Sequence, residues 1–169
     1  MAPEERICTP FSLVPVELGQ RIKGVKTLRA YLSLKLRFEG KSYLVRGELI
    51  YQKMNHRMKV RFLSPFGFTV AEVLHTKRGF YLYIPSEEAV YRGSMEREGW
   101  ICLSFAAYRW FDGVRMPTLL YGKIRRMEFE LRIKQVKANI KISPKDIALY
   151  LPDGTKTFPI KGFFDTFLP

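Results

Sequence analysis

Apolar and polar residues alternate along most of this chain, and the alternation is cleanest over residues 27–38. Even-numbered positions in this stretch are apolar, whereas most odd-numbered positions are polar or cationic. A period of two predicts a β-strand with one buried face and one solvated face. Glu39 and Gly40 then predict a turn into a second strand over residues 42–52.

Shorter segments with the same period follow at close spacing. Turn residues separate them, most clearly at residues 53–56 and at residues 64–67. A series of hairpins at this spacing favours an antiparallel meander or barrel over alternating strands and helices. Strands are predicted over residues 57–62, 68–75, 79–85 and 89–93.

Three segments fall outside this pattern. Leu18 and Ile22 have the i, i+4 spacing of a short helix over residues 16–23, and the proline-punctuated residues 1–15 are expected to be irregular. The run over residues 100–111 is so apolar that its periodicity does not distinguish a buried helix from a buried strand.

The C-terminal part contains a strand whose apolar face changes. Apolar residues occupy odd positions from Met127 to Ile133 and even positions from Val136 to Ile142. Because a strand keeps one face, this change predicts a bulge or bend near residues 134–135. The chain shows no repeat, low-complexity segment or linker, so residues 1–169 are expected to form a single domain of mainly β (α+β) class.

The net charge indicates that the protein binds an anionic partner. The chain has 29 Lys and Arg residues against 16 Asp and Glu residues, a formal charge of +13. Such an excess implies affinity for nucleic acid, an acidic protein or a phospholipid surface. Nucleic acid is disfavoured, because the aromatic residues do not interleave with basic ones in a known signature. Basic residues opposite the apolar rows either solvate the outer face or meet lipid headgroups; they are Arg29, Lys35, Arg37, Arg57, Lys59, Arg61, Arg132 and Lys134.

No arrangement typical of an enzyme active site is found. Only two histidines occur, His56 and His75, and neither has a cysteine or carboxylate at metal-ligand spacing. Cys102 lies in an apolar run, which indicates a buried small hydrophobic residue, and its spacing from Cys8 does not decide whether the two pair. We therefore expect a protein that is not an enzyme and uses no metal or cofactor.

The apolar rows are extensive relative to the helices predicted to cover them. A large sheet with little helical cover either fills its interior with its own side chains or encloses an apolar ligand. The residue pattern leaves both arrangements open. The residues expected on the apolar face are Leu32, Leu34, Leu36, Phe38, Val60, Phe62, Phe80, Leu82, Ile84, Phe129, Leu131 and Ile133.

Several motifs also occur in a characteristic order. They are Leu34–Phe38, Met58–Leu63, the turn Ser64–Gly67, Phe80–Pro85 and Val90–Gly93. This order resembles the LolB-like branch of the LolA/LolB family of periplasmic lipoprotein-localisation proteins. The resemblance implies an open antiparallel half-barrel with short helices as its lid. It also implies that the concave apolar face holds the acyl chains of lipoproteins or other lipids.

The resemblance gives the turn after residue 63 a role in membrane contact. The family's loop carries an exposed apolar residue that touches the membrane, and Phe66 occupies that position here, with Phe68 beside it. The implied location is the periplasm or the periplasmic face of the outer membrane. The implied partners are an anionic membrane surface and a lipoprotein donor or acceptor protein. No lipobox is identifiable at Cys8, because no apolar region precedes it.

Two other functions stand beside lipid binding. A structural or adaptor domain of the cell envelope would fill the sheet with its own side chains. A basic nucleic-acid-binding barrel would use the cationic rows and show a steep salt dependence. Lipid binding is the leading hypothesis. Each buried methylene contributes about 0.8 kcal/mol, so even partial enclosure of one acyl chain would give useful affinity.

Overall fold

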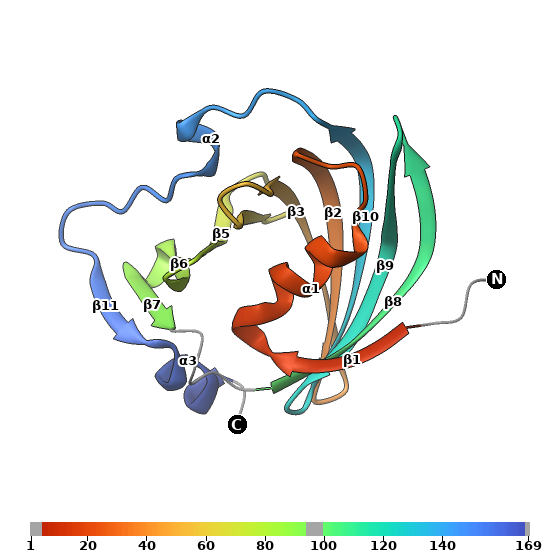
Figure 1. Ribbon diagram of the computed structural model, residues 1–169. Helices are drawn as coiled ribbons and strands as arrows, with labels where there is room; N and C mark the ends of the chain where they lie inside the picture. Colours follow the sequence, from red (N-terminus) through yellow and green to blue (C-terminus); the bar gives the residue numbers. More distant parts are fainter. Residues whose placement is uncertain (1–4, 94–99, 168–169) are drawn as a thin grey trace.

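The part of the chain that the structure describes is built around one strongly curved β-sheet, with three short α-helices (Figure 1). The structure, a computed structural model, describes residues 5–93 and 100–167. The strands are β1 (Glu5–Pro10), β2 (Thr27–Phe38), β3 (Lys41–Gln52), β4 (Arg57–Leu63), β5 (Thr69–Thr76), β6 (Gly79–Ile84), β7 (Ala89–Gly93), β8 (Trp100–Phe111), β9 (Val114–Ile124), β10 (Met127–Ala138) and β11 (Lys156–Pro159). The helices are α1 (Val14–Arg21), α2 (Pro144–Ile147) and α3 (Ile160–Phe167), with 3-10 turns η1 (Phe11–Leu13) and η2 (Pro85–Glu87).

The strands form an 11-stranded sheet in the order β1-β8-β9-β10-β2-β3-β4-β5-β6-β7-β11. Neighbouring strands are antiparallel, except that β11 runs parallel to β7. The sheet does not close, since β1 and β11 are its two edges, and it curves around α1 (Figure 1). The predicted open antiparallel half-barrel, mainly β with short helices, is therefore confirmed.

Local turn chemistry explains why the central hairpin forms where the sequence predicts it. β2 and β3 pair without interruption from Thr27 opposite Gln52 to Phe38 opposite Lys41. Both turn residues lie in the left-handed region, with φ of 50° at Glu39 and 75° at Gly40. Two positive φ values give a turn whose twist matches the twist of the flanking strands.

The predicted bulge in β10 is also confirmed. The register between β10 and β2 shifts between Lys134 and Lys137, and Gln135 has a φ of 50°. One extra residue in one strand turns the following side chains to the other face. Ile133 and Val136 consequently both point into the core, at 4% and 9% exposure.

Two sequence-based expectations need correction. Residues 1–15 are not irregular throughout, because residues 5–10 form the edge strand β1 paired with β8. Residues 100–111 form a strand with only one buried face, since Trp100 and Trp110 are 66% and 70% exposed. The first outcome depends on a pairing between segments about 95 positions apart, which no local pattern reports. The second reflects the hairpin of β8 with β9, which leaves one face of β8 in solvent.

Cys8 and Cys102 form a disulfide between β1 and β8. They face each other in the strand register, with their Cα atoms 4.1 Å apart. Cys102 is thus not the buried small hydrophobic residue that we expected. It alternates with buried Ile101 and Leu103, so its side chain lies on the opposite face of β8.

Helix α1 fills one end of the concave side. Leu18 and Ile22 are 5% and 2% exposed. Gly19 lets the helix approach Tyr51 of β3 closely, because a Cβ at position 19 would lie 2.6 Å from the tyrosine hydroxyl. Burial raises the pKa of Tyr51. We call this covered region the closed end of the sheet.

Arg21 fastens α1 to the edge of the sheet. Its guanidinium forms ion pairs with Glu5 at 2.6 Å and Glu17 at 2.9 Å, and it lies 4.4 Å from the centroid of the Phe105 ring. The helix is therefore held to both β1 and β8.

Helix α3 covers a second part of the concave side. Phe164 is 5% exposed and packs against Phe11, with ring centroids 5.7 Å apart. Arg125, in the β9–β10 turn, donates a hydrogen bond to the Phe164 carbonyl oxygen at 2.9 Å and pairs with Asp165 at 3.2 Å. These contacts link α3 to the β9–β10 hairpin.

No helix in the described part of the chain has both the length and the apolar character needed to cross a membrane.

Candidate functional site

The inner face of the sheet carries one apolar row that is buried at one end and partly accessible at the other. Along β2, Leu28 and Ala30 are fully buried and Leu32 is 4% exposed. Leu34 and Leu36, further along the same face, are only half-buried. The apolar row therefore extends beyond the part that α1 covers.

Cross-strand pairing brings the predicted apolar residues to this face. Leu36 lies opposite Phe129 and Leu34 opposite Leu131, and residues directly opposite each other share a face. Three of the predicted residues belong to the closed core, namely Leu32, Phe80 and Ile133. The others are half-buried: Leu34, Val60, Phe62, Leu82, Phe129 and Leu131 pack against the core, whereas Leu36, Phe38 and Ile84 lie outside it.

The half-buried residues gather at the end of the sheet opposite α1. β2 ends there, β10 begins there with Phe129, and β4 reaches it with Phe62. We call this end the mouth, defined by Leu36, Phe38, Phe62 and Phe129 together with the loop over residues 64–68. An apolar ligand placed at the mouth would cover side chains that the protein itself leaves partly exposed.

The loop over residues 64–68 projects its aromatic side chains from the mouth. Gly67 donates a backbone hydrogen bond to the Ser64 carbonyl oxygen at 3.0 Å, and the Ser64 amide donates to the Phe68 carbonyl oxygen at 2.8 Å. Gly67 has a φ of 87°, which favours glycine. Phe66 and Phe68 are 87% and 72% exposed. Phe66 therefore does not fold back against its own turn.

Three exposed apolar residues missed by the sequence reasoning lie beside this loop. Arg46 pairs with Leu63, so continuing the same register places residues 43–45 beside the loop. Tyr43 and Leu44 are 51% and 66% exposed, and Val70 is 41% exposed. The sequence does contain one signal for this exposed apolar group, since Leu44 is an apolar residue on the polar face of its strand.

The outer cationic rows are partly neutralised. Glu48 accepts contacts from Arg29 and Arg61, each at 3.9 Å. Lys59 pairs with Glu72 at 3.7 Å. Arg132 is likewise paired with Glu130, while Lys35, Arg37, Arg57 and Lys134 form no ion pair with an acidic residue within the described ranges. The positive charge of the second group is therefore not offset by an acidic side chain of the described residues.

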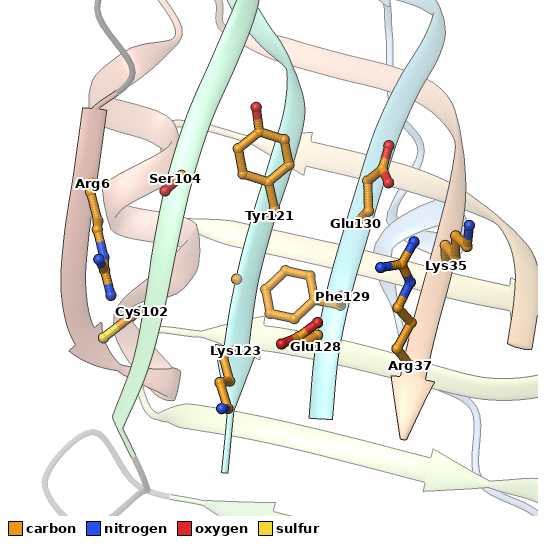
Figure 2. A pocket seen from close by; sticks show the side chains of 11 residues that line it. Arg6, Lys35, Arg37, Cys102, Ser104, Tyr121, Lys123, Glu128, Phe129 and Glu130 are labelled. Atoms are coloured by element: carbon orange, nitrogen blue, oxygen red, sulfur yellow. The ribbon is translucent and has the colours of Figure 1, made fainter. Parts of the chain in front are cut away.

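A shallow pocket of about 320 Å³ lies across β1, β8, β9, β10 and β2 (Figure 2). Its lining mixes both charges, so it offers no uniform site for an anion. Of the predicted apolar residues it includes Phe129, whose ring is next to Gly122. The full lining is Arg6, Lys35, Arg37, Cys102, Ser104, Tyr121, Gly122, Lys123, Glu128, Phe129 and Glu130.

No three His, Cys, Asp or Glu side chains converge as a metal site among residues 5–93 and 100–167. Burial, together with a hydrogen bond to Glu87 at 2.9 Å, raises the pKa of Tyr91, which disfavours its ionised form.

Comparisons with known proteins support the same fold. No protein-family model matches the chain, and no curated protein matches it. A DUF1329 family protein from Desulfovibrio piger superposes with a TM-score of 0.62 at 10% identity, covering 81% of this chain and 95% of that chain. A LolA superfamily protein from Nitrosomonas europaea superposes with a TM-score of 0.55 at 8% identity, covering 83% and 98%.

A third structure carries a functional description. It is a domain of Vibrio parahaemolyticus described as an outer membrane lipoprotein-sorting protein, with a TM-score of 0.56, 12% identity, and coverage of 80% of this chain and 95% of that chain. Identities this low establish the fold alone. The chain therefore has the open half-barrel fold seen in LolA superfamily structures.

Proposed function

We propose that this protein is a non-enzymatic carrier or acceptor of the bacterial cell envelope that binds the acyl chains of lipoproteins or other lipids. The observation that carries the proposal is that the half-buried inner row and the exposed loop lie at the same end of the sheet. An acyl chain leaving a membrane at Phe66 would meet the half-buried side chains of Leu36 and Phe62 at the mouth.

The energetic gain comes from covering surface that is already partly desolvated. Leu36 and Phe38 are half-buried but lie outside the core cluster. Each methylene transferred from water onto such a surface contributes up to about 0.8 kcal/mol. Partial enclosure of one acyl chain is therefore sufficient for binding.

The fold and the disulfide support a location in the envelope. LolA superfamily and lipoprotein-sorting structures share this half-barrel. The Cys8–Cys102 bridge is typical of an oxidising compartment such as the periplasm. Within the superfamily we assign the chain to the LolB-like branch, because Phe66 has the exposure that the family's membrane-touching loop requires. Its partners would be an anionic membrane surface and a lipoprotein donor or acceptor.

Displacement of a fluorescent fatty acid tests the proposal. Leu36→Glu places a charge on the inner row outside the core, and we expect about a tenfold or greater loss of affinity. The matched control is Tyr31→Glu, because Tyr31 lies on the opposite face of β2 and is 46% exposed. We expect the control to bind the fatty acid like the wild type.

Absence of fatty-acid binding by the wild-type protein, with no lipid retained in native mass spectrometry, would contradict the proposal. That result would favour the structural or adaptor domain with a self-filled interior. Oligonucleotide binding with a steep dependence on salt would favour the nucleic-acid alternative.

A further inference from the structure

A larger groove lies on the outer face of the sheet, on the other side from the inner apolar row. Its volume is about 700 Å³, and it opens between β4, β5, β6 and the segment that joins α2 to β11. That segment runs outside the sheet (Figure 1). The residues that line the groove are Asn55, Arg57, Leu74, Thr76, Lys77, Arg78, Tyr81, Leu149 and Leu151.

The segment over residues 148–156, which we call the strap, is tied to the sheet at its two ends. Lys59 donates a hydrogen bond to the Ala148 carbonyl oxygen at 2.8 Å. The Lys156 amide donates to the Glu88 carbonyl oxygen at 2.9 Å. Between these ties, no hydrogen bond joins residues 149–151 to the sheet in the part of the chain that the structure describes. The strap consequently stands off the sheet and leaves the groove beneath it.

The polar side of the groove is positively charged. Arg57, Lys77 and Arg78 line it, and none of its lining residues is acidic. None of the three cations forms an ion pair with an acidic side chain of residues 5–93 or 100–167. An Arg guanidinium presents a planar fork of donors that matches phosphate oxygens. This side of the groove therefore suits a phosphate group.

The other side of the groove is apolar. Leu149 and Leu151 of the strap face the groove together with Leu74 and Tyr81. Leu74 belongs to the outer face of β5 but is only 8% exposed. Arg92 holds the Tyr81 ring, with its guanidinium carbon 5.4 Å from the ring centroid. A ligand that used the whole groove would need an aliphatic part beside its anionic group.

We propose that the groove binds one monomeric anionic amphiphile, a single lipid molecule whose phosphate lies at Arg57, Lys77 and Arg78 and whose apolar part lies under the strap. The volume falls in the range of small-molecule sites. β4 runs from Arg57 at the groove to Leu63 beside the membrane loop, a separation of about 20 Å. The groove and the loop thus lie at opposite ends of β4, and the groove takes a single lipid molecule rather than the bilayer surface that Phe66 would touch. This site is independent of the inner row.

Isothermal titration with dihexanoyl phosphatidylglycerol, used below its critical micelle concentration, tests the assignment. The variant Lys77→Gln/Arg78→Gln changes two exposed turn residues, and we expect about a 30-fold loss of affinity. The control Lys134→Gln/Lys137→Gln removes the same charge from exposed positions of β10, and its affinity should stay within about twofold of wild type. Leu151→Ser, in the strap, should weaken binding about fivefold.

Other ligands and one inner-face variant complete the test. The same titrations are repeated in the Leu36→Glu background, in which the proposed acyl-chain site is impaired. The loss caused by Lys77→Gln/Arg78→Gln relative to its control should persist there, which separates the groove from the proposed acyl-chain site. Equal affinities for Lys77→Gln/Arg78→Gln and its control would overturn the assignment. So would inorganic phosphate binding as tightly as the lipid, since the apolar side would then contribute nothing. Tighter binding of a hexaglutamate peptide would replace the lipid with an acidic protein segment.

Discussion

The Phe129 ring of β10 occupies the space that a side chain at Gly122 of β9 would need. The two residues are cross-strand partners, and a Cβ at position 122 would lie 2.8 Å from the end of the Phe129 ring. The same Cβ would be even closer to the Cys102 carbonyl oxygen. The Cys102 oxygen belongs to the backbone of β8, so no side-chain rotation relieves this contact.

Gly122→Ala is therefore expected to lower the free energy of unfolding by about 1–3 kcal/mol. Urea denaturation followed by circular dichroism measures this change. Gly162→Ala is the control, because position 162 lies in α3 with no atom within 4 Å of the added Cβ. It should be neutral or stabilising by up to about 1 kcal/mol. Equal losses in the two variants would contradict this account of Gly122.

Phe66→Glu should weaken binding to vesicles that contain anionic phospholipid by about tenfold, because the exposed ring could no longer enter the membrane. Co-sedimentation with the vesicles measures the affinity. Met54→Glu is the control, since Met54 is 81% exposed in the β3–β4 turn at the closed end of the sheet. If both variants bound equally well, the loop would have no special role at the membrane.

Replacing both cysteines, as Cys8→Ser with Cys102→Ser, should lower the free energy of unfolding by about 2–4 kcal/mol. The bridge spans a sequence separation of 94 and restricts the unfolded chain. Urea denaturation with and without dithiothreitol provides the measurement. Dithiothreitol should destabilise the wild type to the level of the double variant and leave the double variant unchanged. A wild type unaffected by complete reduction would show that β1 is held by packing alone.

Asp146, at the start of α2, should titrate below its ordinary range. Hydrogen bonds from the Ser143 hydroxyl at 3.0 Å and amide at 3.1 Å lower the pKa of this carboxyl from 3.8, and Arg29 adds to the effect at 3.3 Å. A lowered folded-state pKa stabilises the protein above the ordinary pKa, and this contribution is lost as pH falls through the folded-state value.

Ser143→Ala should raise the pKa of Asp146 towards its ordinary value of 3.8. Carbon-13 NMR titration of the carboxyl group measures the shift. Ser42→Ala, a change at an exposed position of β3, should leave the titration as it is in the wild type. An unchanged midpoint in Ser143→Ala would assign the lowering to the Ser143 amide and Arg29 instead.

Local patterns were sufficient for the hairpins from β2 to β7 and for the set of residues on the apolar face, whereas β9 was not predicted. The alternation from Thr27 to Phe38 predicted β2 at its observed bounds, because a period of two follows directly from backbone geometry. The change of parity after Ile133 located the bulge for the same reason. The candidate lipid-binding role of these side chains remains a prediction.

Those local patterns could not predict pairing between strands that are distant along the chain. β1 and the Cys8–Cys102 bridge exist because β1 pairs with β8, and the sequence between them carries no signal of that contact. The exposed Trp100 and Trp110 show the same limit, since hydrophobicity alone suggested burial of the whole segment.

The sequence by itself determined which side chains share the inner face, since alternation along a strand is a local property of the chain. Only the tertiary structure decided which part of that face is covered. α1 packs against Tyr51 and closes one end, whereas Leu36 and Phe129 at the mouth stay half-buried. The physical reason is that burial depends on where a helix docks. Docking is set by contacts such as Gly19 against Tyr51, which join segments that are distant along the chain.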